Sequence, residues 1–176
     1  MFYLTSQHKG DSAAISALLD RAFGADRKNK NSYTYRQGLA PVHGLSFVAR
    51  EHGAIVGTIR YWPLLIEGSS GQVPALLLGP VAVEPVRQGD GIGVELIRHT
   101  LRLATAAGHR LVLLVGDADY YGRFGFAPAG QHDILMDGEP HRLMVRELVP
   151  GALTGVDGHV VSWRCLRPGA GAFLAA

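Results

Sequence analysis

The sequence predicts a single α/β domain built on a central mixed β-sheet that is flanked by helices. Residues 76–115 hold an apolar run, a glycine-rich turn, an amphipathic segment and a second apolar run, which is the pattern of a crossover between parallel strands. Two apolar segments around residues 51–54 instead indicate an antiparallel hairpin. With 176 residues, of which 47% are hydrophobic and 18% charged, residues 1–176 fit one globular domain with a substantial core.

The first 24 residues are expected to form a strand and a helix. Residues 2–5 favour a short strand, and Asp11 or Ser12 can cap a helix that runs to Ala22. Apolar residues recur along this helix at three- and four-residue steps, which gives it one core-facing side. Gly24 would end it.

A short helix and two strands are expected next. Residues 27–31 are polar and basic and favour a loop, and residues 32–38 favour the second helix. Residues 45–50 favour a strand, residues 51–54 a hairpin turn, and residues 54–66 a longer return strand. These two strands supply the antiparallel part of the sheet.

The strand over Leu76–Val83 is the centre of the predicted fold. Four consecutive apolar residues before Gly79 indicate a strand buried on both faces, whereas an edge strand would be more polar. Pro80 cannot donate a hydrogen bond to a central ladder. We therefore expect a β-bulge at Gly79-Pro80.

A helix and a second buried strand complete the crossover. Leu111–Val115 is short and wholly apolar, as a central parallel strand should be, and Gly108 would end the helix before it. One core-facing stripe of the helix is predicted to hold Gly93, Leu96, Ile97, Thr100, Leu101 and Ala104. The turn at 88–93 then lies at the carboxyl end of a strand, where open α/β sheets bind ligands.

The C-terminal part favours shorter strands. Residues 132–136 and 143–148 flank a turn at 137–140, and residues 160–165 favour a final strand. Residues 150–176 form an extension whose role the sequence does not assign.

The turn Gln88-Gly89-Asp90-Gly91-Ile92-Gly93 is a candidate phosphate site. A glycine-rich turn at a helix N-terminus offers unpaired backbone N–H groups and the positive end of the helix dipole. The usual nucleotide patterns, G-x-G-x-x-G and G-K-S/T, do not fit these residues. An ordinary strand-to-helix turn is the alternative.

Gln88-x-x-Gly91-x-Gly93 resembles the acyl-CoA pyrophosphate loop, Q/R-x-x-G-x-G/A, of the GNAT N-acetyltransferase superfamily. The segment 116–126 is similar to the family's Y-x-x-x-G-F segment, with Tyr121 on the family's tyrosine. The forms L-G-P-V-A-V and Y-Y-G-R-F-G-F resemble the YhbS-like branch of predicted bacterial acetyltransferases. The likeness covers residues 2 to about 150 and is sharpest over residues 76–128.

The resemblance implies a GNAT-like fold, in which the bulged strand splays from its parallel neighbour and opens a cleft for pantetheine. It implies acetyl-CoA as acyl donor, no metal, and direct attack by a primary amine in a ternary complex. The expected cofactor-binding residues are Val81, Ala82 and Val83 for the pantetheine amides, and Gln88, Gly89, Asp90, Gly91, Ile92 and Gly93 for the pyrophosphate. Asp90 departs from the family, where Lys or Arg is common, and would repel a pyrophosphate.

The resemblance also suggests how the reaction is catalysed. Tyr121 is the expected catalytic acid that protonates the leaving thiolate, with Tyr120 or a purely packing role for Tyr121 as alternatives. A backbone N–H of Val81 or a neighbour would polarise the thioester carbonyl. The general base stays open between Glu84, Asp117, Asp119 and water, and each carboxylate can equally be a cap or a solvated surface group.

Two segments are candidates for the acceptor side of this cleft. The second helix would bring Tyr33, Tyr35 and Arg36 near it, unless they are surface residues of a loop. In the strand over residues 54–66, Arg60 and Trp62 point to one face and Tyr61 to the other. They would line the cleft, or form a core tryptophan beside an edge arginine.

The amino-acid composition limits the classes of partner that the protein is expected to bind. A net charge of +2 without a basic run argues against nucleic acid, and the sequence has no apolar stretch of membrane-span length. A single cysteine, Cys165, fits a reducing cytoplasm, and the eight histidines show no metal spacing. We expect a cytoplasmic enzyme with a small-molecule or peptide amine acceptor, and a homodimer stays open. The alternatives are a non-catalytic acyl-CoA sensor and a module for another phosphate ligand.

Overall fold

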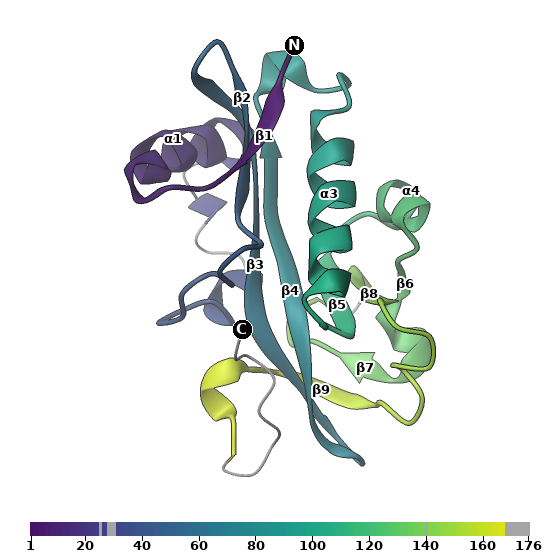
Figure 1. Cartoon of the computed structure of the whole chain (residues 1–176). Coiled ribbons are helices and arrows are strands. Elements are labelled where there is room, and N and C mark those ends of the chain that lie inside the picture. Colours follow the sequence, from purple (N-terminus) through teal and green to yellow (C-terminus); the bar gives the residue numbers. More distant parts are fainter. Residues whose placement is uncertain (25, 28–30, 140, 168–176) are drawn as a thin grey trace.

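Two long antiparallel strands, β3 (Ala54–Gly68) and β4 (Gly71–Val83), run through the middle of the molecule (Figure 1). The structure is a computed structural model that describes residues 1–24, 26–27, 31–139 and 141–167. The remaining strands are β1 (Tyr3–Ser6), β2 (Phe47–Glu51), β5 (Leu111–Val115), β6 (Ala127–Pro128), β7 (Ile134–Leu135), β8 (Leu143–Glu147) and β9 (Gly158–Ser162).

Within the described residues, nine strands form one sheet in the order β1-β2-β3-β4-β5-β8-β6, and β9 pairs with β3 and β7. The β4–β5 pair is parallel, as predicted for the crossover, and the β2–β3 hairpin is antiparallel. The predicted mixed sheet is therefore confirmed. Part of the C-terminal extension joins it, because β9 lies antiparallel to β3 at the end away from the β2–β3 turn.

Helices cover both faces of the sheet (Figure 1). On one face lies α1 (Ser12–Phe23), which packs against Val48, and on the other lies α3 (Ile92–Ala106), which packs against Ala49. Adjacent residues of β2 thus serve opposite layers, as strand alternation requires. Two short helices, α2 (Asn31–Thr34) and α4 (Ala118–Tyr121), lie in the connections.

The predicted bulge lies where β4 leaves β5. On β4, Leu78 pairs with Tyr61 and Val81 pairs with Ile59, so Gly79 and Pro80 together oppose the single residue between them on β3. The β4–β5 ladder consists of two pairs, which end at Leu77. Beyond the bulge, β4 continues along β3 without β5 beside it. The sheet therefore contains the splayed strand pair that the resemblance implied.

Helix α3 follows the predicted pattern. The residues that it buries are Ile92, Leu96, Ile97, Thr100, Leu101 and Ala104. The hydroxyl of buried Tyr61 lies 2.9 Å from the Thr100 Oγ1, which donates to the Leu96 carbonyl at 2.7 Å. This chain of hydrogen bonds satisfies polar groups between helix and sheet that would otherwise be costly to bury.

Some local details differ from expectation. Asp11 precedes α1 but does not cap it, because its carboxylate accepts from the His8 N–H at 2.9 Å and from the Arg50 guanidinium at 2.6 Å. The second helix ends at Thr34 and continues as turns to Gly38. The final strand ends at Ser162, whose side chain accepts from the next turn.

Candidate active site

A cleft of about 650 Å³ opens where β4 and β5 part. Its floor is the bulge of β4, residues 78–81, and the end of β5, residues 115–117. Its walls come from the end of α1, the α2 segment, β3 and α4. Because β5 has left β4 at this point, the edge of β4 over Val81–Val83 has no strand on its β5 side. Such an edge offers ladder groups to a ligand.

The loop of residues 88–93 lies between β4 and α3, and its backbone suits an anion. Gly89 and Gly91 take left-handed conformations with φ of 94° and 79°. Gly91 is the N-cap of α3, so the N–H groups of Ile92, Gly93 and Val94 have no carbonyl one turn earlier in the helix. The turn thus places the free N–H groups of Ile92 and Gly93 at a positive dipole end, while the N–H groups of Gln88 and Asp90 donate to the Pro85 and Arg87 carbonyls at 3.3 and 3.4 Å.

The charge of Asp90 is offset by a neighbour. Its carboxylate accepts from Arg87 Nε at 2.6 Å, and Arg87 also pairs with Glu51 at the end of β2. The repulsion between Asp90 and a pyrophosphate is therefore weaker than the sequence alone suggests. An arginine also stands beside the loop, although at a different position from the basic residue of the family.

Tyr121 and Tyr120 both line the cleft from α4. The Tyr121 ring packs against Gly116, where an added Cβ would overlap it, and lies edge-on to Phe126 at 6.1 Å between ring centroids. Burial, followed by the neighbouring Tyr120, raises the pKa of Tyr121 to about 12. The phenol therefore keeps its proton at neutral pH, as a general acid must.

Tyr120 is oriented toward the loop. Its hydroxyl lies 3.2 Å from the position that a Cβ on Gly93 would take. Burial also raises the pKa of Tyr120, and the ring stands nearly perpendicular to Tyr121 at 4.9 Å. The two phenols are thus neighbours with different surroundings, Tyr120 beside the loop of residues 88–93 and Tyr121 beside the end of β5.

The three candidate bases differ in their surroundings. Glu84 accepts from Arg21 at 2.8 Å, and this interaction lowers the pKa of the Glu84 carboxyl. Asp117 lines the cleft, but its carboxylate caps α4 by accepting from the Asp119 N–H at 2.8 Å. Asp119 is exposed and is not part of the lining. A fourth carboxylate, Glu139, lines the cleft, and sequence reasoning did not single it out.

Most, but not all, of the residues expected on the acceptor side line the cleft. Tyr33, Arg36, Arg60 and Trp62 line the cleft, whereas Tyr61 lies in the core on the opposite face, as alternation predicted. Trp62 Nε1 donates to the Gly79 carbonyl at 2.7 Å, which ties β3 to the bulge.

Tyr35 and Arg142 differ from the expectation for the acceptor side. Tyr35 packs instead with the second core cluster, near Asp137. Arg142, missed in the sequence, also reaches the cleft. Arg142 lies near Tyr121 only in the folded structure. No local sequence pattern therefore marks it as a residue of the cleft.

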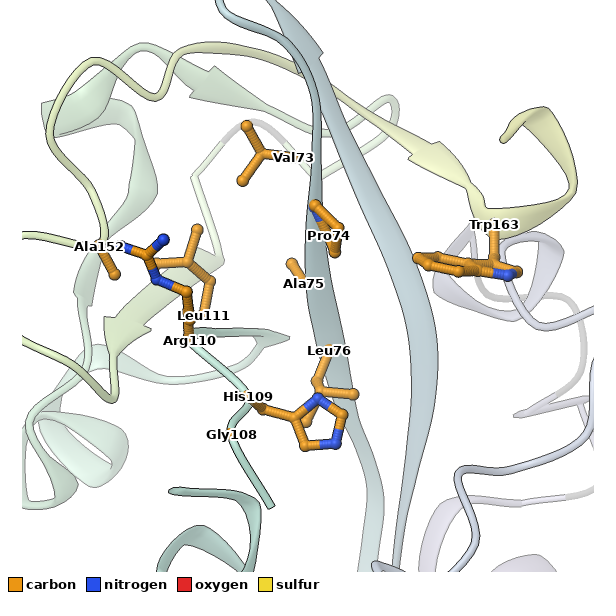
Figure 2. Close-up of a pocket in the computed structure, with 10 residues that line it drawn as sticks. All are labelled: Val73, Pro74, Ala75, Leu76, Gly108, His109, Arg110, Leu111, Ala152 and Trp163. Atoms are coloured by element: carbon orange, nitrogen blue, oxygen red, sulfur yellow. The ribbon is translucent and has the colours of Figure 1, made fainter. Parts of the chain in front are cut away.

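A smaller hollow of about 100 Å³ lies at the other end of α3 (Figure 2). Pro74 and Leu76 of β4 border it together with His109, Arg110 and Trp163. Its lining is mostly apolar and includes none of the predicted site residues. In the part of the chain that the structure describes, no helix has the length and apolar character needed to cross a bilayer, and no three His, Cys, Asp or Glu side chains group as a metal site.

Comparison with known proteins agrees with this geometry. The family model of the acetyltransferase (GNAT) domain matches residues 5–129. The chain is 30% identical over 152 residues to the uncharacterized N-acetyltransferase YhbS of Escherichia coli K12, covering 85% of this chain and 89% of that protein.

Two solved structures resemble the whole fold. E. coli YhbS in complex with CoA matches with a TM-score of 0.78 and 27% identity, over 92% of this chain and 89% of that one. A GNAT family acetyltransferase from Brucella melitensis in complex with acetyl-CoA matches with a TM-score of 0.69 and 29% identity, over 92% of this chain and 95% of that one.

Proposed function

The chain belongs to the acetyltransferase (GNAT) family, and from this premise we propose that it moves the acetyl group of acetyl-CoA to a primary amine by direct attack in a ternary complex. The observation that carries the proposal is the cleft at the bulge of β4, because two tyrosines line it, the open edge of β4 continues from it, and the Tyr120 hydroxyl lies next to Gly93 of the loop. The two solved relatives whose complexes hold CoA or acetyl-CoA support the choice of donor.

The proposed roles follow the surroundings of each residue. The amides of Gly89 to Gly93 hold the pyrophosphate, and the edge of β4 over Val81–Val83 pairs with the pantetheine amides. An N–H at Val81 or beside it polarises the carbonyl of the thioester. These groups are backbone atoms held by the bulge and by the start of α3, so they need little rearrangement on binding.

The chemical step then needs one acid and one base. As the neutral amine attacks the carbonyl carbon, the carbon–sulfur bond breaks and Tyr121 donates a proton to the departing sulfur. The attacking nitrogen loses a proton to water or to a carboxylate of the cleft, Asp117 or Glu139. Glu84 is a poor candidate for this base, because its pairing with Arg21 favours the charged form and weakens its basicity.

Acetyl-CoA is expected to raise the melting temperature, because a ligand that binds only the folded state stabilises it. At a hundredfold excess over the dissociation constant the gain is about 2.7 kcal/mol. Differential scanning fluorimetry with acetyl-CoA, ATP and NAD as separate ligands measures the effect. The donor assignment fails if millimolar acetyl-CoA leaves the transition unmoved, or if ATP or NAD shifts it equally.

The rate of acetyl transfer to a simple amine is expected to rise with pH and then level off, without a falling limb below about pH 10. The rise reflects deprotonation of the amine. The absence of a fall reflects the raised pKa of Tyr121, about 12, which keeps the acid protonated throughout. A falling limb at about pH 8 to 9 that vanishes in Tyr121→Phe would contradict the assignment of a phenol with a raised pKa.

A further inference from the structure

Two arginines line the cleft close to the bulge without an acidic partner. A guanidinium nitrogen of Arg36, Nη2, lies 3.5 Å from the position that a Cβ on Gly79 would take, so its charge lies at the bulge. Arg60, from the same wall, donates through Nε to the Gln7 side-chain oxygen at 2.8 Å. Among the described residues, neither arginine forms an ion pair, and the buried Nε of Arg36 has no hydrogen-bond partner.

Arg36 differs from the arginines elsewhere in the described residues. Five of those pair with a carboxylate at nitrogen–oxygen distances between 2.5 and 2.8 Å: Arg21, Arg27, Arg50, Arg87 and Arg167. Six more are exposed to solvent, namely Arg98, Arg102, Arg110, Arg123, Arg142 and Arg164, and half-buried Arg146 donates to the Phe124 carbonyl. Arg36 instead has burial and the charge of Arg60 against it, and burial lowers the pKa of its guanidinium to about 10. A half-buried cation without a partner is costly, and an anion that arrives with the right geometry removes that cost.

The rest of the cleft carries both signs of charge. Arg27 is already bonded to Asp20, while Arg142 is exposed at the rim. Asp117 and Glu139 line the same cleft as Arg36. A substrate that carries an amine and an anionic group would therefore find opposite charges for both of its ends. A purely cationic amine would place its charge against two arginines that lack an acidic partner.

We propose that the acceptor amine carries a carboxylate or a phosphate, which Arg36 and Arg60 bind and so place the amine at the bulge of β4. This inference rests on the proposed acetyl transfer for the identity of the amine. The donor's own pyrophosphate is assigned to residues 88–93, at the start of α3. The anion at Arg36 is therefore a second one, at the end of the cleft where the thioester would lie. Guanidinium groups suit such an anion because they bind oxyanions through two parallel hydrogen bonds.

Matched amines test the proposal even before the natural acceptor is identified. Two pairs differ in their anionic group: β-alanine against β-alaninamide, and O-phosphoethanolamine against ethanolamine. Spermidine represents a purely cationic amine. Binding is followed through Trp62, which lines the cleft, in a Trp163→Phe background and with CoA at saturation so that the loop of residues 88–93 is filled. Comparison of the carboxylate and phosphate pairs shows which anion the cleft prefers.

The anionic member of at least one pair should bind at least about tenfold more tightly than its neutral partner, and Arg36→Gln should remove most of that difference. Arg60→Gln should reduce it, and Arg36→Lys should keep part of it. Arg102→Gln is the matched control, because Arg102 is an exposed arginine of α3 outside the cleft. Release of CoA thiol from acetyl-CoA should follow the same order of preference.

The proposal is overturned if no anionic amine binds, if neutral or cationic amines bind as tightly, or if Arg36→Gln leaves the preference unchanged. Failure of the acetyl transfer itself gives a different result. In that case acetyl-CoA would neither shift the melting temperature nor be turned over. The titrations would then be repeated without CoA, and loss of anionic-amine binding in Arg36→Gln would still show the anion site.

Discussion

Replacing Tyr121 with phenylalanine is expected to lower turnover by about 100-fold or more, while the fold and the affinity for acetyl-CoA are retained. The substitution keeps the ring that packs against Gly116 and Phe126 and removes only the hydroxyl. The loss falls on the step in which the sulfur departs, because a thiolate would then leave without a placed proton donor. Steady-state kinetics with thiol detection, beside a titration of acetyl-CoA, separates the two effects.

Tyr120→Phe is the internal control for this experiment. The Tyr120 hydroxyl points toward Gly93, so its loss should affect acetyl-CoA affinity slightly and turnover much less than the change at Tyr121. Near-parental turnover of Tyr121→Phe, under conditions where chemistry limits the rate, would remove Tyr121 as the acid. The proton would then come from Tyr120 or water, and the acetyl-CoA assignment would remain.

Gly91→Val is expected to weaken CoA binding by about tenfold or more. The left-handed backbone of Gly91, with φ of 79°, is unfavourable for a branched side chain, so the loop must rearrange. A Cβ at this position would meet no heavy atom within 4 Å, so internal packing does not explain the effect. Isothermal titration with CoA measures it directly.

Gly108→Val is a matched control for that backbone change. Gly108 has φ of 82° and equally open space around its Cβ position, but it follows the other end of α3. It should lose similar stability and bind CoA like the parent. Asp90→Lys should strengthen CoA binding modestly, most visibly at low salt, because it removes a negative charge that Arg87 only partly offsets. If Gly91→Val and Asp90→Lys both bind like the parent, the pyrophosphate lies elsewhere.

The elements that were predicted best are those whose structure follows from a local sequence pattern. The run of β5, the bulge at Gly79-Pro80 and the stripe of α3 follow from periodicity and from the chemistry of proline, which act locally. The short elements were predicted less well. Strand β7 has two residues and exists through its pairing with β9, which no local pattern encodes. The second helix was placed correctly but was expected to be longer than its four residues.

The site residues that were predicted from the sequence likewise lie in local motifs, whereas those that were missed depend on the folded chain. The tyrosines of α4 line the cleft, Tyr120 lies next to Gly93 of the loop at residues 88–93, and the tyrosines and the loop each belong to a short contiguous segment. The partners that set the charges come from distant parts of the chain. Arg21 is 63 residues from Glu84, and nothing near Glu84 in the sequence predicts that pair. Glu139 reaches the cleft from a turn whose position depends on the later strands.

The free edge of β4 has a consequence for how the molecule avoids self-association. A strand edge at the rim of a sheet exposes unpaired N–H and C=O groups to any other chain, and such edges promote aggregation. In this fold the open edge over Val81–Val83 lies inside the sheet, with β3 on one side and β5 diverging on the other. The divergence of β5 leaves a gap at this edge rather than an outer rim of the sheet, and an extended small molecule can enter that gap. The splay thus keeps ladder groups available for a ligand without adding an exposed rim to the protein.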